Sequence, residues 1–84
     1  MLREYEYVFM TILHQKLKGK IKAGIHVGIH SDNIKVDIVL DGAVNFTYTI
    51  YDFSNKLLHD YTTDYAVYEI TEAYKRYVLA KHFY

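Results

Sequence analysis

The chain contains no cysteine, no proline and no tryptophan. Without cysteine it can form no disulfide, no cysteine-ligated zinc site and no thiolate nucleophile. It also contains no apolar run approaching 18 residues, so no membrane-spanning helix is expected. These absences leave packing or self-association as the sources of stability for a chain this short.

The chain also has no excess of positive or negative charge, because ten Lys and Arg residues balance ten Asp and Glu residues. A net charge of zero gives no general attraction to nucleic acid or to an anionic membrane, and it weakens repulsion between copies. The first residues, Met1 to Tyr7, include two glutamates and lack the basic and apolar regions of a signal peptide. We therefore expect a cytoplasmic protein without membrane contacts.

What is present indicates one folded domain over residues 1–84. Hydrophobic residues make up 51% of the chain, which excludes general disorder. Ten tyrosines stand out, since a tyrosine combines an apolar ring with a hydroxyl that tolerates water. Such residues suit either the margin of a small core or an interface, and the composition leaves both interpretations open.

Two segments have helical periodicity. Over residues 2–17, apolar residues recur at three- and four-residue spacing, with acids early and lysines late, and Gly19 is placed to end the helix. The second helix is predicted from Thr63 onward, with Thr62 or Thr63 as its N-cap. Its expected buried stripe consists of Ala66, Ile70, Ala73, Tyr74, Tyr77 and Val78.

Between the helices, strict alternation predicts three strands over residues 20–30, 34–40 and 44–51. A first turn centred on Asp32–Asn33 would pair Ile29 with Val36 and Ile25 with Leu40. For the second turn, a three-residue loop, Asp41–Gly42–Ala43, pairs Leu40 with Val44 and keeps Phe46 on the apolar face. Residues 52–62 give no clear pattern, although Ser54 could cap a short helical turn.

The assembled prediction is an α+β fold in the order α-β-β-β-α, a three-stranded antiparallel meander with both helices on one face. The other face is left to water or to a partner. In the predicted register, His26 lies beside Val39 and Asn45, and His30 beside Lys35 and Thr49. Glycines weaken strands and often mark a close backbone approach, so this face is a candidate contact strip. The predicted interaction surface consists of Gly24, His26, Gly28, His30, Asp37, Val39 and Thr47.

His26 and His30 do not form a metal site in this prediction, because four residues along a strand separate them by about 13 Å. No G-x-S-x-G, phosphate-loop, G-x-G-x-x-G or H-E-x-x-H motif is present. His14 and the pair His59–Asp60 could act in acid–base chemistry, but no companion group is visible. We expect no enzyme activity, no cofactor and no small-molecule substrate.

A run of four lysines, Lys16, Lys18, Lys20 and Lys22, is the one candidate nucleic-acid contact. The element order resembles that of the double-stranded RNA-binding domain, a family that holds the RNA backbone with a lysine-rich start to its second helix. Here the matching segment, Thr62 to Val67, has no lysine and one acid, so RNA binding is not implied. In size and Tyr-, Ile- and Lys-rich composition the chain also resembles small phage and prophage proteins.

The function expected from the sequence is a non-enzymatic protein-interaction module, acting as a homodimer or binding another protein. The alternative is a nucleic-acid-binding domain that uses the lysine run.

Overall fold

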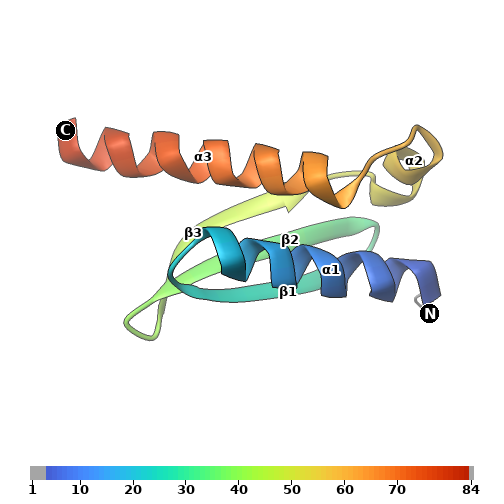
Figure 1. Cartoon of the computed structure of the whole chain (residues 1–84), viewed down its shortest axis with the longest axis horizontal. Coiled ribbons are helices and arrows are strands. Elements are labelled where there is room, and N and C mark those ends of the chain that lie inside the picture. Colours follow the sequence, from blue (N-terminus) through green and yellow to red (C-terminus); the bar gives the residue numbers. More distant parts are fainter. Residues whose placement is uncertain (1–3, 84) are drawn as a thin grey trace.

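The computed structural model describes residues 4–83, and of Phe83 only the backbone. The elements are α1 (Glu4–Lys20), β1 (Gly24–His30), β2 (Asn33–Leu40), β3 (Ala43–Ile50), α2 (Phe53–Leu58) and α3 (Thr63–Phe83) (Figure 1). The predicted α+β fold is confirmed, with the short helix α2 added in the segment that the sequence left open. Leu2, which we placed in the first helix, and Tyr84 lie outside the described residues.

Helix α1 follows the predicted charge order, with Glu4 and Glu6 in its first turn and Lys18 and Lys20 in its last. It runs past Gly19, which we expected to end it, and Gly19 does not adopt a positive φ. The first strand correspondingly begins at Gly24 rather than at residue 20. Ile21, which the prediction placed in the first strand, lies instead in the connection after α1 and is buried in the core.

The predicted register of β1 against β2 is wrong by two residues. The turn consists of Ser31 and Asp32, so that Ile25 pairs with Ile38 and Val27 with Val36. Ser31 takes a φ of 56° and Asp32 does not share a positive φ, a pattern typical of a type II′ turn. A shift of two residues leaves each side chain on its predicted face, because the side-chain period of a strand is two.

The second hairpin contains a β-bulge in place of the predicted three-residue loop. Asp41 and Gly42, with φ values of 52° and 79°, form a two-residue turn in which Leu40 pairs with Ala43. Ile38 pairs with Phe46 and Val39 with Val44, so Asn45 is the extra residue of β3. The bulge keeps Phe46 on the apolar face, as predicted, but turns Val44 outward, where 60% of its side chain is exposed.

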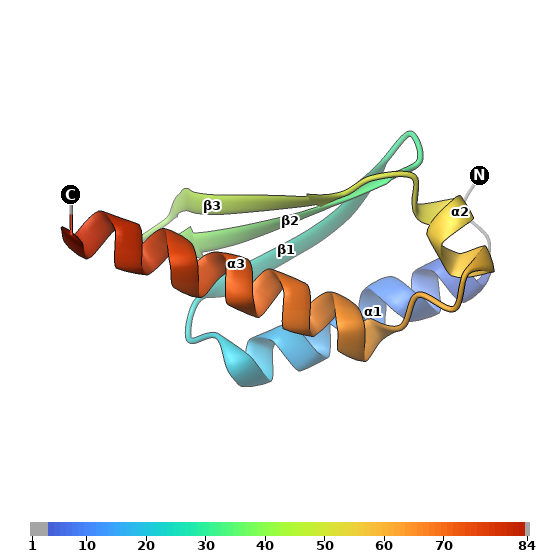
Figure 2. The ribbon, with the colours of Figure 1, turned by 90° about the horizontal axis from the view of Figure 1, so that it is seen from above.

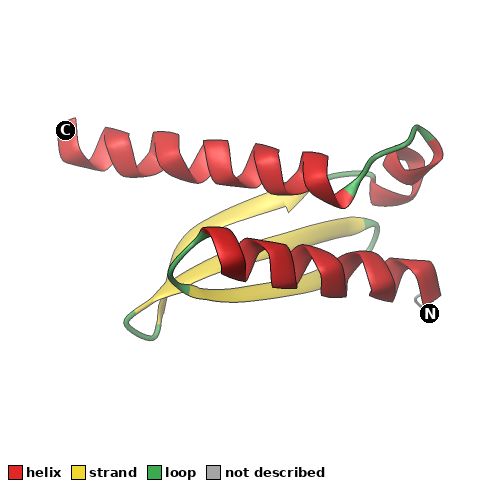
Figure 3. Cartoon of the chain, in the orientation of Figure 1, coloured by secondary structure: helices red, strands yellow, loops and turns green. Residues whose placement is uncertain are grey.

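The two long helices lie on one side of the sheet, and no element within residues 4–83 covers its other side (Figure 2). Helix α1 contacts β1 and α3, and α3 also contacts β3. Figure 3 separates the two layers by colour, helices in red and strands in yellow. The core between the layers consists of Phe9, Leu13, Leu17, Ile21, Ile25, Ile34, Val36, Ile38, Ile50, Phe53, Ala66, Val67 and Ile70.

Helix α2 is held by the first turn of the sheet. Its N-cap residue, Asp52, makes no side-chain cap bond. Instead, the carboxylate of Asp32 accepts hydrogen bonds from the backbone N–H and the hydroxyl of Ser54, at 3.2 and 2.6 Å. Ser54, which we expected to cap this helix, is therefore inside it, and a residue twenty-two positions earlier does the capping.

Helix α3 begins as predicted, because the hydroxyl of Thr62 accepts a hydrogen bond from the backbone N–H of Tyr65 at 3.1 Å. Of the predicted stripe, Ala66 and Ile70 are fully buried and the rest are half-buried. Val67, which the prediction omitted, is also buried because α1 lies beside α3.

Candidate interaction surface

The outer face of the sheet carries the seven residues of the predicted interaction surface. Their neighbours across the strands differ from the prediction, because the register of β1 with β2 differs by two residues. His26 lies beside Asp37 and Thr47, Gly28 beside Lys35 and Thr49, and Gly24 beside Val39 and Val44. The pairs His26–Val39 and His30–Lys35, predicted from the earlier register, are wrong by the same two residues. Their faces are right, and all seven predicted residues lie on this side of the sheet.

Polar contacts on this face are local. The hydroxyl of Thr47 donates a hydrogen bond to Asp37 at 2.7 Å across the β2–β3 pair. His26, Gly28 and His30 are exposed, while Asp37 and Val39 are half-buried. A shallow hollow over β1 and β2 is lined by His26, Val27, Gly28, Ile29, His30, Lys35 and Asp37. The strip is open to solvent.

Strand β1 is an edge strand of the sheet. Within residues 4–83, β1 pairs with β2 alone. A two-residue turn closes on a hydrogen-bonded pair, here His30 with Asn33, and hydrogen-bonded pairs then alternate along the strand. The backbone N–H and C=O groups of Ile25, Val27 and Ile29 therefore point away from β2, toward the free edge.

One of these edge groups has a partner. The Nε2 atom of His14 lies 2.9 Å from the carbonyl oxygen of Ile25, so α1 reaches the rim of the sheet at this point. The imidazole donates this bond because a carbonyl can only accept. This contact also supports the alternation derived above, since a side chain outside the sheet can reach only a carbonyl that points outward.

The two glycines of β1 differ in their surroundings. A Cβ atom added at Gly28 would meet nothing within 4 Å, whereas one at Gly24 would lie 3.4 Å from the Cβ of Val39. Gly28 is thus not required by packing within this chain. Both glycines leave the backbone of an edge strand uncovered, which favours approach by another backbone.

The four lysines of the run have different surroundings in the structure. Lys16 forms an ion pair with Asp64 at 2.6 Å and donates a hydrogen bond to the hydroxyl of Thr63 at 3.0 Å. Lys18 and Lys20 lie in the last turn of α1, and Lys22 lies in the bend that follows it. The first strand was predicted over residues 20–30, which would include Lys20 and Lys22, but both lysines precede β1 in the structure. A nucleic-acid contact by this run stays a prediction.

A second hollow, which is polar and has a volume of about 500 Å³, lies where α2 meets the start of α3. Its lining includes Lys56, His59, Asp60, Tyr61, Tyr65 and Glu69. The sequence showed His59–Asp60 without companions, because the other groups come from positions before and after the loop. Their proximity depends on the turn from α2 into α3, which sequence pattern does not specify.

The carboxylate of Glu69 in this hollow already has hydrogen-bond donors within the chain. Glu69 accepts hydrogen bonds from Tyr61 at 2.8 Å and from Tyr48 at 3.4 Å. Burial, followed by the hydrogen bond and charge of Glu69, raises the pKa of Tyr61 far above its usual range. Burial and the nearby carboxylate likewise raise the pKa of Tyr48. Both phenols remain protonated donors at neutral pH, so Glu69 is occupied by two structural bonds.

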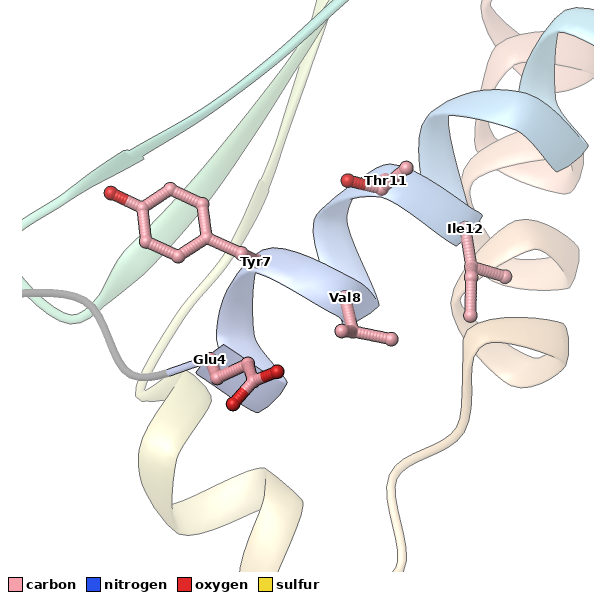
Figure 4. Close-up of a pocket in the computed structure, with 5 residues that line it drawn as sticks. All are labelled: Glu4, Tyr7, Val8, Thr11 and Ile12. Atoms are coloured by element: carbon pink, nitrogen blue, oxygen red, sulfur yellow. The ribbon is translucent and has the colours of Figure 1, made fainter.

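A third hollow runs along the outer surface of α1, lined by Glu4, Tyr7, Val8, Thr11 and Ile12 (Figure 4). Tyr7 and Val8 are 56% and 50% exposed, and Figure 4 shows them on different sides of the helix. All five residues belong to one helix, so no second element of the described chain closes the hollow. The apolar residues of this helix are therefore only partly covered by β1 and α3.

Within the part of the chain that the structure describes, no helix has the length and apolar character to cross a membrane. Over the same residues, no three His, Asp or Glu side chains gather as ligands for a metal ion.

No protein-family model, curated protein or solved structure matches this chain.

Proposed function

We propose that this chain is a non-enzymatic protein-interaction domain that receives a β-strand at the free edge of β1. The added strand belongs to another protein or to a second copy of the chain, and the outer sheet face forms the adjoining contact. Strand addition is a common mode of protein recognition, in which main-chain hydrogen bonds supply affinity and alternate side chains supply specificity.

The observation that carries this proposal is the unpaired edge of β1. Proteins usually blunt such edges with inward charges, proline, bulges or a covering element. The chain has no proline, and the register of β1 with β2 is regular over all seven pairs. The bulge occurs on β3 instead. Among residues 4–83, the carbonyl of Ile25, which accepts a hydrogen bond from His14, is the one group with a partner along this edge.

The side chains along β1 support the same proposal. Ile25 is buried against the core, whereas Val27 and Ile29, on the same face, are half-buried. Their neighbours in β2, Val36 and Ile34, are fully buried. An added strand would cover the exposed part of Val27 and Ile29 while pairing their backbone groups, so apolar burial and hydrogen bonding would act together.

A matched pair of proline variants tests the proposal. Val27→Pro removes an N–H from the free edge of β1, where proline is sterically tolerated in a strand. Thr49→Pro is the control, because the same alternation places the N–H of Thr49 on the far edge of β3. Binding is measured by sedimentation of the chain alone and by photo-crosslinking from cell extract at Gly28.

We expect association, with itself or with a captured protein, that survives Thr49→Pro and is lost in Val27→Pro. A chain that neither self-associates nor captures a protein in a manner sensitive to Val27→Pro would overturn the proposal. Circular dichroism of both variants confirms that the comparison is between folded proteins.

A further inference from the structure

The free edge of β1 is self-complementary. The backbone N–H and C=O groups that point toward this edge belong to Ile25, Val27 and Ile29. Val27 is the midpoint of the strand Gly24–His30. Two antiparallel copies related by a two-fold axis at Val27 would pair Val27 with Val27, and Ile25 with Ile29 in both directions. All three residues then occupy hydrogen-bonded positions, and the full length of the strand is used.

Centring the axis elsewhere gives a poorer match. An axis at His26 would set the two His26 side chains opposite each other and leave Ile29 beyond the last hydrogen-bonded pair. An axis at Gly28 would set glycine opposite glycine and leave Ile25 unpaired. The centre of the strand is thus the position at which edge hydrogen bonds and side chains both match.

The outer face of the same arrangement pairs each histidine with a glycine. Gly24, His26, Gly28 and His30 alternate along one side of β1. With the axis at Val27, His26 faces Gly28 of the second copy and His30 faces Gly24. An imidazole ring laid across a bare glycine covers backbone that would otherwise weaken the strand, as aromatic rings do for edge glycines. The glycines and histidines, unexplained within one chain, acquire a joint role.

The inner face and the charges are also compatible. Val27 and Ile29 are half-buried and would be covered by Val27 and Ile25 of the second copy. The contact of His14 with Ile25 can persist, because a carbonyl oxygen accepts two hydrogen bonds. The chain carries no net charge at neutral pH, so two copies approach without general repulsion.

We propose that the partner at the β1 edge is a second copy of this chain, paired antiparallel about Val27, which joins two three-stranded sheets into a continuous six-stranded sheet. The inference rests on the proposed function, for which it names the partner and the register. The geometry is isologous, so it closes at two copies and leaves both β3 edges at the ends of the sheet.

Oligomeric state is the first test. Sedimentation equilibrium from about 10 µM to about 1 mM should give a mass that rises from that of the monomer toward twice that value. The monomer mass is 10.0 kDa. Val27→Pro removes both hydrogen bonds at the axis, so it should weaken dimerisation by at least about tenfold, while Thr49→Pro should leave it unchanged.

The register is tested by cysteine pairing, for which the cysteine-free chain is well suited. His26→Cys and Gly28→Cys are made as separate chains, and a Cβ atom at position 28 meets no atom of the described chain within 4 Å. With the axis at Val27, positions 26 and 28 of different copies face each other at about 4.5 Å between Cα atoms. Like positions are diagonal neighbours about 7–8 Å apart, which is outside disulfide range.

Each outcome decides the question. A mixture of the two variants that forms a disulfide rapidly, when neither variant does so alone, supports the register. Rapid pairing of His26→Cys alone would move the axis to His26, and pairing of Gly28→Cys alone would move it to Gly28; either result overturns the inference. A monomer at all concentrations also overturns it, yet the proposed function then survives if Val27→Pro abolishes binding to another protein.

Discussion

At one end of the sheet, the Ser31–Asp32 turn is fastened to α2. At the other end, a side-chain hydrogen bond joins the segment that follows the Asp41–Gly42 turn to α3. Asp32 accepts hydrogen bonds from Phe53 and Ser54, and Phe53 stacks edge-to-face on Phe9 at 4.9 Å. At the opposite end, Lys81 donates to Asn45 at 3.1 Å, and Val44 lies exposed.

The difference shows where a small chain without disulfides obtains its stability. The end with α2 adds a second cluster of rings to the main core, since Phe9 also lies 5.9 Å from Tyr61. Toward the Asp41–Gly42 end, Phe46 of β3 lies 5.0 Å from the ring of Tyr77 in α3. The turn beyond Phe46 depends on its own geometry, with φ values that glycine adopts freely and that aspartate tolerates. We expect substitutions to have large effects at the first end and small effects at the second.

The largest effect is expected for Phe53→Ala. Phe53 is fully buried, so removal of its ring should lower the free energy of unfolding by about 3–5 kcal/mol, enough to unfold much of a marginally stable chain. Urea denaturation followed by circular dichroism measures the change. Leu58→Ala, in the same helix but 81% exposed, is the control and should change stability by less than about 0.5 kcal/mol. Equal losses in both variants would show that α2 is not part of the core.

A smaller loss is expected for Tyr61→Phe, which removes a hydroxyl from Glu69 but keeps the ring against Phe9. Leaving the carboxylate with a weaker partner should lower the free energy of unfolding by about 1–2 kcal/mol. Tyr65→Phe is the control, since Tyr65 is 58% exposed. An unchanged stability in Tyr61→Phe would mean that water replaces the bond to Glu69 without penalty.

The same tyrosine predicts a dependence on alkaline pH. The pKa of Tyr61 is raised in the folded state, so its contribution is complete below the usual tyrosine pKa of 10.0 and is lost as pH rises above that value. Wild type should therefore lose stability above pH 10 more steeply than Tyr61→Phe. Parallel curves for the two proteins would contradict the assignment.

Asp32→Ala should have a still smaller effect, with a reproducible decrease in the urea midpoint. The hydrogen bond from Ser54 lowers the pKa of Asp32, so this contribution exists above the unfolded value near 3.8 and disappears as pH falls through the lower folded value. The difference from wild type should be present at pH 6 and absent in strong acid. Asp37→Ala, which removes a carboxylate that binds Thr47 far from α2, is the control.

The smallest effect is expected for Val44→Thr at the free end, within about 0.5 kcal/mol, because the bulge turns Val44 toward solvent. Urea denaturation again gives the measurement. A loss of more than about 1 kcal/mol would indicate that Val44 points into the core, as a three-residue loop without a bulge would require.

Much of the architecture follows from sequence periodicity, and the errors have physical causes. Alternation assigns Ile25, Val36 and Phe46 to the buried face, and the structure agrees. Alternation has a period of two, however, so it cannot detect a hairpin register that is displaced by two residues, as at Ser31–Asp32. The same limitation conceals Asn45, because a three-residue loop and a two-residue loop with a bulge give identical inward positions beyond it.

The candidate site was only partly accessible to sequence reasoning. The composition of the outer face could be predicted from the alternation of Gly24, His26, Gly28 and His30. The free edge of β1 could not, because an edge is defined by which strand lies alongside and not by the strand itself. The contacts of His14 with Ile25 and of Lys16 with Asp64 depend on how α1 is set against its neighbours, for which local pattern carries no signal.

The bulge at Asn45 has a consequence for how this sequence can vary among relatives. Because Asn45 opposes no residue of β2, its deletion would restore a regular ladder with the pairs Val39–Val44 and Ile38–Phe46 intact. The main loss would be the contact with Lys81. This hairpin can therefore lose one residue without displacing any buried side chain. Edge strand β1, with its seven regular pairs, does not share this tolerance to a change in length.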